Sequence, residues 1–190
     1  MSFVHLQVIS AYSLLQTTTR IEDLVRSAKT KGYQAIALTD QNVLYGQVDF
    51  FKLCKKYAIQ PILGIQLDLP GIISKDRTFP LVLLAKDFEG YKKLMALSTV
   101  RNQDVPDKEL FSLLDDDSSR IIAITPGEKG EIESFLNGDD QQNAKTASLA
   151  WKKIFGHGNF YLGVQLHEKM KPIIPGLKRL SQETNIPTTA

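Results

Sequence analysis

Short apolar runs alternate with longer amphipathic segments along the whole 190-residue chain. The apolar runs have the length of β-strands, and the segments between them carry apolar residues at helical spacing. Strands are expected at 3–9, 35–39, 61–67, 81–85, 121–125, 160–165 and 186–190. Helices are expected at about 19–31, 47–57, 88–100, 107–114, 131–136, 143–155 and 176–184. This alternation predicts a parallel sheet, either open or closed into a barrel.

Bulk composition narrows the class of protein. Hydrophobic residues make up 43% of the chain and charged residues 23%, which is typical of a globular protein. The formal net charge is only +2 with the two signs interspersed, so no basic stripe indicates a nucleic-acid surface. Cys54 is the single cysteine, which excludes an internal disulfide and fits a reducing compartment. Neither a signal peptide nor a membrane-spanning run is visible, so we expect a cytoplasmic protein with no membrane partner.

Polar residues gather where the expected strands end. With right-handed crossovers, the carboxyl ends of parallel strands lie on one face, and barrel enzymes build their active sites there. His5 and Gln7 lie in the first expected strand, Asp40 and Gln41 follow the second, and Gln66 lies near the end of the third. A barrel-type active site would be built at this end of the sheet, near these five residues.

Six ordered motifs span essentially the whole chain. They read FVHLQVISAYSLL at 3–15, ALTDQNVLYG at 37–46, PILGIQ at 61–66, LVLLAK at 81–86, FYLGVQ at 160–165 and IPTTA at 186–190. In order and spacing they resemble the PHP (polymerase and histidinol phosphatase) domain that begins the α subunit of bacterial DNA polymerase III. The resemblance implies a distorted (β/α)7 TIM-like barrel, truncated near the start of its last strand. It also implies one PHP domain at 1–190, the N-terminal fragment of a larger polymerase.

Active members of this family hold two or three metal ions, and a metal-bound hydroxide attacks a phosphoester. Most positions that match the family's metal ligands carry other residue types in this chain. The matching positions are His5, Gln7, Gln16, Gln41, Gln66 and Pro80. Pro126 and Gly127 stand where a further ligand is expected, and the last Asp-x-His pair would fall beyond Ala190. Amide oxygens are weak, neutral ligands for zinc or manganese, so we expect no catalytic metal and no hydrolysis.

Two further residues are candidates for a remnant of this pocket. Asp40 is expected to brace the turn after its strand. His167 follows the strand at 160–165, so it either faces the pocket or lies at the surface. The substituted polar side chains are expected to persist as a hydrogen-bonded network without the ion.

Three functions stay open. The first is a structural and interaction module of a replicative DNA polymerase, with the rest of the polymerase chain as its partner and other replisome subunits as candidate partners. In that case DNA is contacted mainly by other domains, and Mg²⁺ is expected only in the polymerase domain, with no cofactor in this segment. The second is an active metal-dependent phosphoesterase or 3′–5′ proofreading exonuclease, which the glutamines oppose. The third is a free-standing phosphatase related to histidinol phosphatase, which the polymerase-type motifs oppose.

Overall fold

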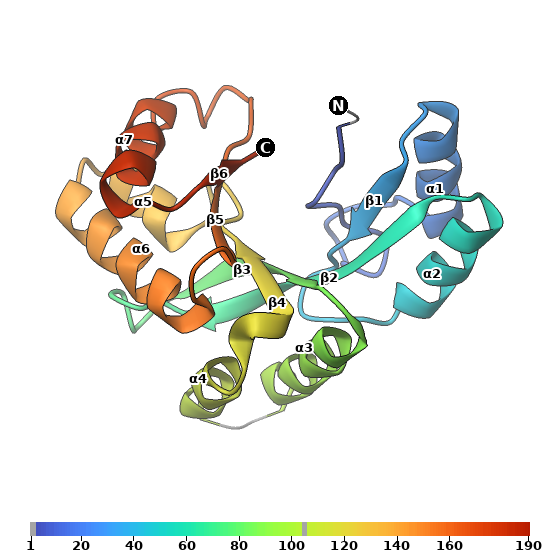
Figure 1. Cartoon of the computed structure of the whole chain (residues 1–190), viewed down its shortest axis with the longest axis horizontal. Coiled ribbons are helices and arrows are strands. Elements are labelled where there is room, and N and C mark those ends of the chain that lie inside the picture. The colour runs from blue at the N-terminus through green and yellow to red at the C-terminus, as the bar shows by residue number, and fades with distance from the viewer. Residues whose placement is uncertain (1–2, 104–105) are drawn as a thin grey trace.

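The computed structural model describes residues 3–103 and 106–190 and contains one curled sheet of six strands. The strands lie in chain order, so that each is paired with the next, and the sheet forms a half-barrel (Figure 1). They are β1 (Ala35–Leu38), β2 (Gln60–Pro70), β3 (Thr78–Ala85), β4 (Ile121–Ile124), β5 (Phe160–Gly163) and β6 (Thr188–Thr189). The expected α/β architecture of barrel type is confirmed.

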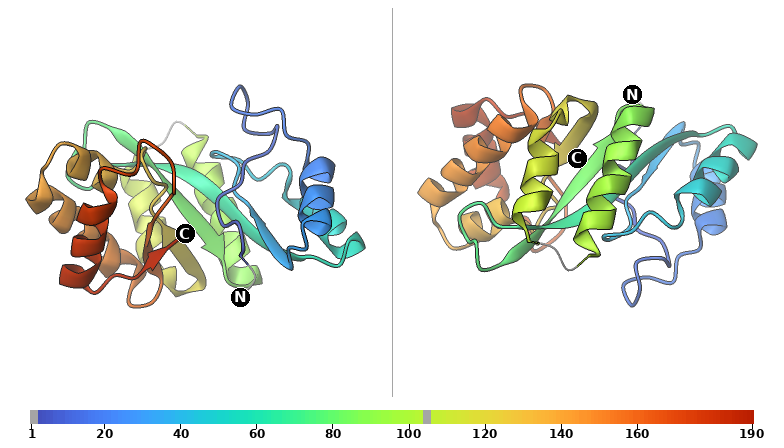
Figure 2. Two further views of the ribbon diagram at one scale, coloured as in Figure 1. Left: turned by 90° about the horizontal axis from the view of Figure 1, so that it is seen from above. Right: turned by 90° about the horizontal axis from the view of Figure 1, so that it is seen from below.

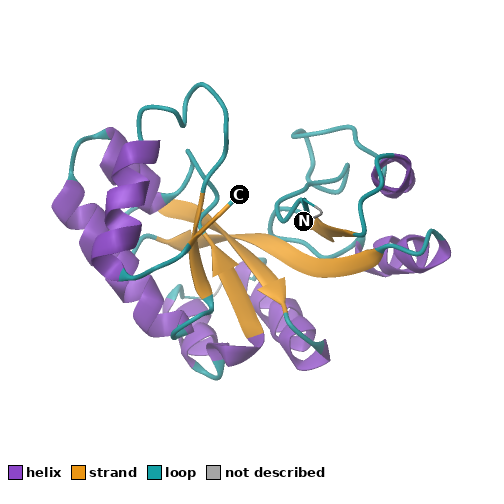
Figure 3. Cartoon of the chain, turned by 45° about the horizontal axis from the view of Figure 1, so that its top comes forward, coloured by secondary structure: helices purple, strands orange, loops and turns teal. Residues whose placement is uncertain are grey.

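The helices cover the outer face of the curl (Figure 3). They are α1 (Ile21–Thr30), α2 (Gln47–Lys56), α3 (Phe88–Arg101), α4 (Lys108–Asp115), α5 (Glu131–Asn137), α6 (Gln141–Phe155) and α7 (Ile174–Thr184), with a 3₁₀ turn η1 (Ser118–Arg120) before β4. Helices α1 and α2 flank β1 and β2, whereas α5, α6 and α7 lie at the β4–β6 end (Figure 1). Helices α3 and α4 lie side by side beneath the middle of the sheet (Figure 2). In the part of the chain that the structure describes, no helix has the length and apolarity needed to cross a membrane.

The apolar side chains form two cores between the sheet and its helices and a smaller one on the inner face of the curl. On β3, Leu81 and Leu83 pack into the main core under the helices, whereas Val82 and Leu84 face the inner side. This alternation follows from the two-residue period of a strand and explains why the whole run is apolar. Cys54 is fully buried in the smaller core between α1, α2 and β1, and burial raises the pKa of its thiol to about 11.

The expectation of an all-parallel sheet is wrong at β3, which runs antiparallel to both β2 and β4. The chain returns through residues 71–77, where the Gly71 N–H donates to the Arg77 carbonyl at 2.9 Å. A parallel crossover needs about a dozen residues or more, so a connection of this length can only form a hairpin. Because β3 runs in the opposite direction, its first half lies at the edge of the sheet where the carboxyl ends of β2 and β4 lie.

The strand expected at 3–9 is not formed. This segment runs beside β1 and makes two backbone hydrogen bonds to it, from the Ala37 N–H to the His5 carbonyl (2.9 Å) and from the Thr39 N–H to the Val8 carbonyl (2.7 Å). Between these two bonds the segment advances three residues while β1 advances two. An extra residue of this kind breaks the alternation of side chains, as a β-bulge does.

Two carboxylates of α5 tie the loops at this edge to the helix. Glu131 accepts hydrogen bonds of 2.9 Å from three successive backbone N–H groups of the hairpin, at Ile72, Ile73 and Ser74. Glu133 is fully buried and accepts a hydrogen bond from the Thr125 hydroxyl, while its Oε2 has no partner among the described residues. Burial raises the pKa of Glu133 from 4.5 to about 7.

We predict that Glu133→Gln stabilises the protein in a pH-dependent manner. Because the pKa is raised in the folded state, ionisation of Glu133 opposes folding, and this penalty is absent below pH 4.5 and complete above pH 7. The neutral amide avoids it. Urea unfolding should show that the variant gains about 3 kcal/mol over the wild type between pH 4.5 and pH 8.

Glu109→Gln, on the exposed face of α4, is the matched control, and its effect on the free energy of unfolding is expected to be the same at both pH values. An equal effect of Glu133→Gln at both pH values would contradict the prediction.

Candidate functional site

A pocket of about 260 Å³ lies where four separate segments of the chain meet. The segments are the N-terminal stretch, β2, the loop after β4 and the loop after β5. The lining residues are Gln7, Ile9, Gln16, Gln66, Pro126, Glu128, Lys129, Gln165 and His167. The fold thus brings together three of the glutamines at ligand positions, and it adds side chains from both loops.

A row of hydrogen-bonded amides spans this pocket. Gln165 Nε2 donates to Gln7 Oε1 at 2.9 Å, and Gln7 Nε2 donates to Gln66 Oε1 at 2.9 Å. Both donors also lie near the Pro126 carbonyl, at 3.2 Å and 3.3 Å. The side-chain oxygens of Gln7 and Gln66 therefore accept hydrogen bonds within the protein. The expected hydrogen-bonded network is observed.

His167 extends this row at the rim of the pocket. Its Nε2 lies 3.2 Å from Gln165 Oε1. An amide oxygen can only accept, so this contact requires the imidazole to carry its proton on Nε2. The side chain is exposed and yet faces the pocket, which combines the two placements expected for it. Donors then point in one direction, from His167 through Gln165 and Gln7 to Gln66.

A second polar group begins at Gln16. Its amide donates to Gln41 Oε1, and Gln41 Nε2 in turn donates to Asp68 Oδ2 at 2.8 Å. Asn42 Nδ2 donates to the same Asp68 oxygen at 2.8 Å. Gln41 itself lies outside the lining of the pocket, but a backbone bridge to Gln66 connects the two groups.

Asp40 braces the turn at 10–13, whereas the expectation was that it braces the turn after its own strand. Its carboxylate is 1% exposed and accepts hydrogen bonds from the Ser10 N–H (2.6 Å), the Ser10 hydroxyl (2.8 Å) and the Ser13 hydroxyl (2.7 Å). Asp40 lies two residues after the end of β1 and holds the turn at 10–13 beside the sheet. Asp40 is therefore a bracing residue and does not line the pocket.

His5 lies outside this pocket, although it shares a neighbouring cavity with Gln7 and Gln165. His5 is exposed, and its Nε2 lies 3.2 Å from the Tyr33 hydroxyl. With Leu6 and Gln7 it lines a neighbouring, mainly apolar cavity of about 320 Å³.

Pro80 also lies apart from the pocket. It pairs with Asp68 in the β2–β3 ladder, whereas Gln66 pairs with Val82. A prolyl ring has no donor or ligand atom to offer, so this position contributes only packing beside the hairpin.

Sequence reasoning missed three of the pocket residues. Gln165 is central to the amide row, although its segment had served only as a motif match. Glu128 and Lys129 come from the loop after β4, and Glu128 Oε2 is buried without a hydrogen-bond partner in the described chain, while its Oε1 lies 3.2 Å from Lys169 Nζ. Their position just past a strand's carboxyl end was the available signal.

The donor set is poor for a transition-metal ion. Within residues 3–103 and 106–190, no three His, Cys, Asp or Glu side chains are grouped so that they could hold a metal. The pocket offers amides together with the carboxylate of Glu128 and the imidazole of His167. Catalytic zinc sites use three nitrogen, sulfur or carboxylate ligands and keep one open position. The residues present do not fit such a centre.

Comparison with known proteins identifies the family of this chain. The model of the PHP domain matches residues 5–167. The chain belongs to the PHP domain family. DNA polymerase III subunit alpha of Bacillus subtilis (strain 168) is 43% identical to this PHP domain over 190 residues, which is 100% of the chain and 17% of that protein. The protein of the same name from Treponema pallidum (strain Nichols) is 30% identical over 200 residues, 98% of the chain and 17% of that protein. The chain thus spans 17% of the length of these relatives.

A solved structure supports the fold of this PHP domain. An amidohydrolase from Chromobacterium violaceum superposes with a TM-score of 0.57 over 97% of this chain and 84% of that one. The two sequences are 10% identical, so the likeness concerns the fold alone.

We predict that Gln7→Ala destabilises the PHP domain by about 1–3 kcal/mol, the range expected when buried polar partners lose their hydrogen bonds. The variant leaves Gln66 Oε1 without its donor and Gln165 Nε2 without one of its acceptors. Gln16→Ala is the control, because its side chain is exposed, and its effect should stay within about 0.5 kcal/mol. Urea unfolding of both variants checks this, and equal effects would contradict the role of the amide row.

Proposed function

We propose that this chain is the PHP domain of a DNA polymerase III α subunit and that it serves the polymerase as a structural and interaction module. Identity of 43% along the entire chain with the Bacillus subtilis subunit supports the assignment to a DNA polymerase III α subunit. On this proposal residues 1–190 form one domain of a larger, cytoplasmic DNA-directed DNA polymerase. The carboxylates and Mg²⁺ of nucleotide addition then belong to other parts of that protein.

The observation that carries the structural role is the amide row through Gln165, Gln7 and Gln66. Two of these residues stand at positions where the family's active members place metal ligands, and their side-chain oxygens already accept hydrogen bonds. An incoming ion would have to break these bonds and would gain only neutral, weak donors in return. We therefore propose that the domain holds no catalytic metal and hydrolyses nothing.

The amide row supplies the rigidity that an ion would otherwise give. It joins the N-terminal segment to β2 and to the loops after β4 and β5, four segments that are far apart in the sequence. A satisfied polar network in a partly buried site fixes the relative positions of its members. A domain held in this way can support the rest of the polymerase chain, and other replisome subunits are candidate partners, with DNA contacted mainly elsewhere.

A metal-dependent phosphoesterase or proofreading exonuclease is the second candidate. The observation that favours it is Glu128, because its Oε2 is buried without a hydrogen-bond partner among the described residues and its side chain lines the same pocket as His167. One carboxylate and one imidazole are fewer ligands than a catalytic zinc ion uses.

Metal content separates the two candidates. After incubation with Zn²⁺ and Mn²⁺ and removal of the excess, elemental analysis is expected to find no stoichiometric metal in the wild-type protein. The Glu128→Gln variant, which keeps the shape of the side chain, should give the same background. If the wild type retains one or more ions per chain and Glu128→Gln does not, the result would favour the metal-dependent phosphoesterase or exonuclease.

Restoring the ligands tests the assignment of the positions. The fourfold variant Gln7→His, Gln16→Asp, Gln41→His and Gln66→Glu supplies two imidazoles and two carboxylates, and we expect it to take up Zn²⁺ or Mn²⁺ above the wild-type level. Gln60→His with Gln142→Asp, which changes two exposed glutamines outside the pocket, is the control.

Elemental analysis of both variants, alone and in the longer polymerase chain, gives the readout. A folded fourfold variant that retains no more metal than the control in either form would show that the positions are wrongly assigned.

A further inference from the structure

Two leucines lie next to each other at the tip of the loop that joins the N-terminal segment to α1. Leu14 is 81% exposed and Leu15 is fully exposed. The left view of Figure 2 shows this loop, at 10–19, projecting from the body of the domain before α1 begins. Isolated apolar side chains are common on protein surfaces, whereas adjacent ones with further apolar neighbours mark a site of interaction.

The backbone at this tip is held in an unfavourable conformation. Leu15 has a φ of 62°, in the left-handed region, which a leucine adopts at a cost in free energy. Because the Leu15 side chain is fully exposed, its own packing inside the domain does not offset this cost. Strained residues of this kind persist only where the surrounding structure fixes them, and they cluster at functional sites.

The base of the loop is fixed by hydrogen bonds. The Ala11 N–H donates to the Thr19 carbonyl at 2.8 Å and closes the loop, and the Ser13 N–H donates to the Ser10 carbonyl at 2.8 Å. The buried Asp40 carboxylate accepts hydrogen bonds from both serine hydroxyls. The tip is therefore presented in one conformation before a partner binds, which lowers the entropy lost on binding.

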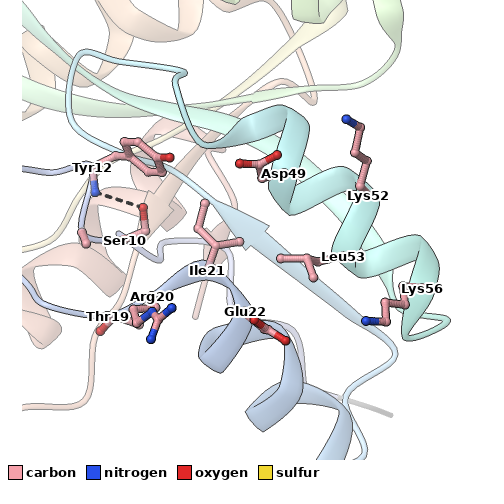
Figure 4. A pocket seen from close by; sticks show the side chains of 11 residues that line it. Ser10, Tyr12, Thr19, Arg20, Ile21, Glu22, Asp49, Lys52, Leu53 and Lys56 are labelled. Carbon is pink, nitrogen blue, oxygen red and sulfur yellow. Dashed lines mark hydrogen bonds between the residues drawn. The ribbon is translucent and has the colours of Figure 1, made fainter.

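Two tyrosines extend the apolar surface from the loop to the start of α2. Tyr12 is 41% exposed and Tyr45 is 74% exposed. A Cβ atom at Gly46 would lie 2.9 Å from Tyr12 Cδ2, so the Tyr12 ring packs on the backbone next to Tyr45. Figure 4 shows this ring at one end of a groove of about 570 Å³ between α1 and α2, and the Tyr12 N–H donates to Ser10 Oγ. These exposed apolar residues form the loop patch, which consists of Tyr12, Leu14, Leu15 and Tyr45.

The composition of the loop indicates the chemistry of its partner. The stretch from 11 to 17 reads AYSLLQT and carries no charged side chain. Cores of protein interfaces are depleted of charge and enriched in tyrosine, whereas nucleic-acid and membrane surfaces attract lysine and arginine. The loop patch therefore fits an apolar groove on another protein surface, with hydroxyl and amide groups at its edge.

The remainder of the subunit is the partner that lies nearest at all times. The chain spans 17% of the length of the DNA polymerase III α subunits that it matches. On the role proposed above, a much longer stretch of the same polypeptide is tethered to this domain. Tethering supplies a high effective concentration, so a contact of a few side chains is enough to hold the domain in place. A second copy of the chain has no such advantage.

We propose that the loop patch docks this PHP domain onto the remainder of its own polymerase chain, with Leu14 and Leu15 inserted into an apolar groove there. The inference rests on the proposed function, because it takes the polymerase chain as the partner. Burial of the Leu15 side chain in the docked state offsets the strain of its backbone. The two leucines are the anchors of the contact, and the tyrosines exclude water around them.

The first experiment measures access to the tip. A Leu14→Cys variant is made in the 190-residue chain and in the full polymerase chain, and maleimide labelling of residue 14 is followed by mass spectrometry. Labelling is expected to be about tenfold or more slower in the polymerase, because a docked side chain reacts only when the contact opens. Leu149→Cys, at a position on α6 that is 45% exposed, is the matched control and should label at rates within about twofold in the two proteins.

The second experiment separates docking from folding. Asparagine adopts the left-handed region more readily than leucine, so Leu15→Asn should leave the 190-residue chain at least as stable in urea as the wild type. In the polymerase, Leu14→Ser combined with Leu15→Asn should raise hydrogen exchange of the loop at 10–19 to the rate seen in the 190-residue chain, because the groove no longer holds the tip. Leu149→Ser should leave this exchange unchanged.

Several outcomes would overturn the proposal. Equal labelling of Leu14→Cys in the two proteins, or unchanged exchange in the double variant, would do so while nucleotide addition by the full chain leaves the proposed function standing. A marked loss of stability in Leu15→Asn would show that Leu15 packs within the domain. Concentration-dependent dimers of the 190-residue chain in light scattering, lost in the double variant, would identify a second copy as the partner. A full chain that adds no nucleotides would overturn the proposed function, and the docking proposal with it.

Discussion

The antiparallel pairing of β2 with β3 holds the two ends of the molecule together. Seven residue pairs, from Gly64–Leu84 to Pro70–Thr78, join the strand that follows α2 to the strand that precedes α3. A Cβ atom at Gly64 would lie 2.8 Å from the Leu83 carbonyl oxygen and 2.6 Å from Leu84 Cδ2, so glycine permits the close approach of the two strands. The outward side chains of β2 and β3 are buried under the helices, and the inward side chains line the inner face of the curl.

The pocket that contains the amide row depends on the inner face of this strand pair. Gln66 lies on β2 and is 6% exposed, so its side-chain oxygen needs a donor from another segment. An unsatisfied buried amide costs about 1–3 kcal/mol, whereas a satisfied one stabilises a single arrangement of the loops. The glutamines of the amide row therefore hold the N-terminal segment, β2 and the loop after β5 in one arrangement.

Asp40 links the pocket to the groove between α1 and α2. Its carboxylate holds Ser10 and Ser13, Ser10 lines the groove, and the next residue after Asp40 belongs to the polar group of Gln16 and Asp68. The two cavities therefore share one buried support, although different side chains line them.

The sequence by itself determined the elements and the chemistry of the ligand positions. Local periodicity located all six strands that the structure contains, and the residue types at 7, 16, 41 and 66 already carried no charge or imidazole for an ion. Only the tertiary structure decided the placement of His5 beside Tyr33 and the entry of Glu128 and Gln165 into the pocket. The physical reason is that the bulge at 3–9 and the order of the amide donors depend on partners more than a dozen residues away, whereas helix and strand periodicity is set by neighbouring residues.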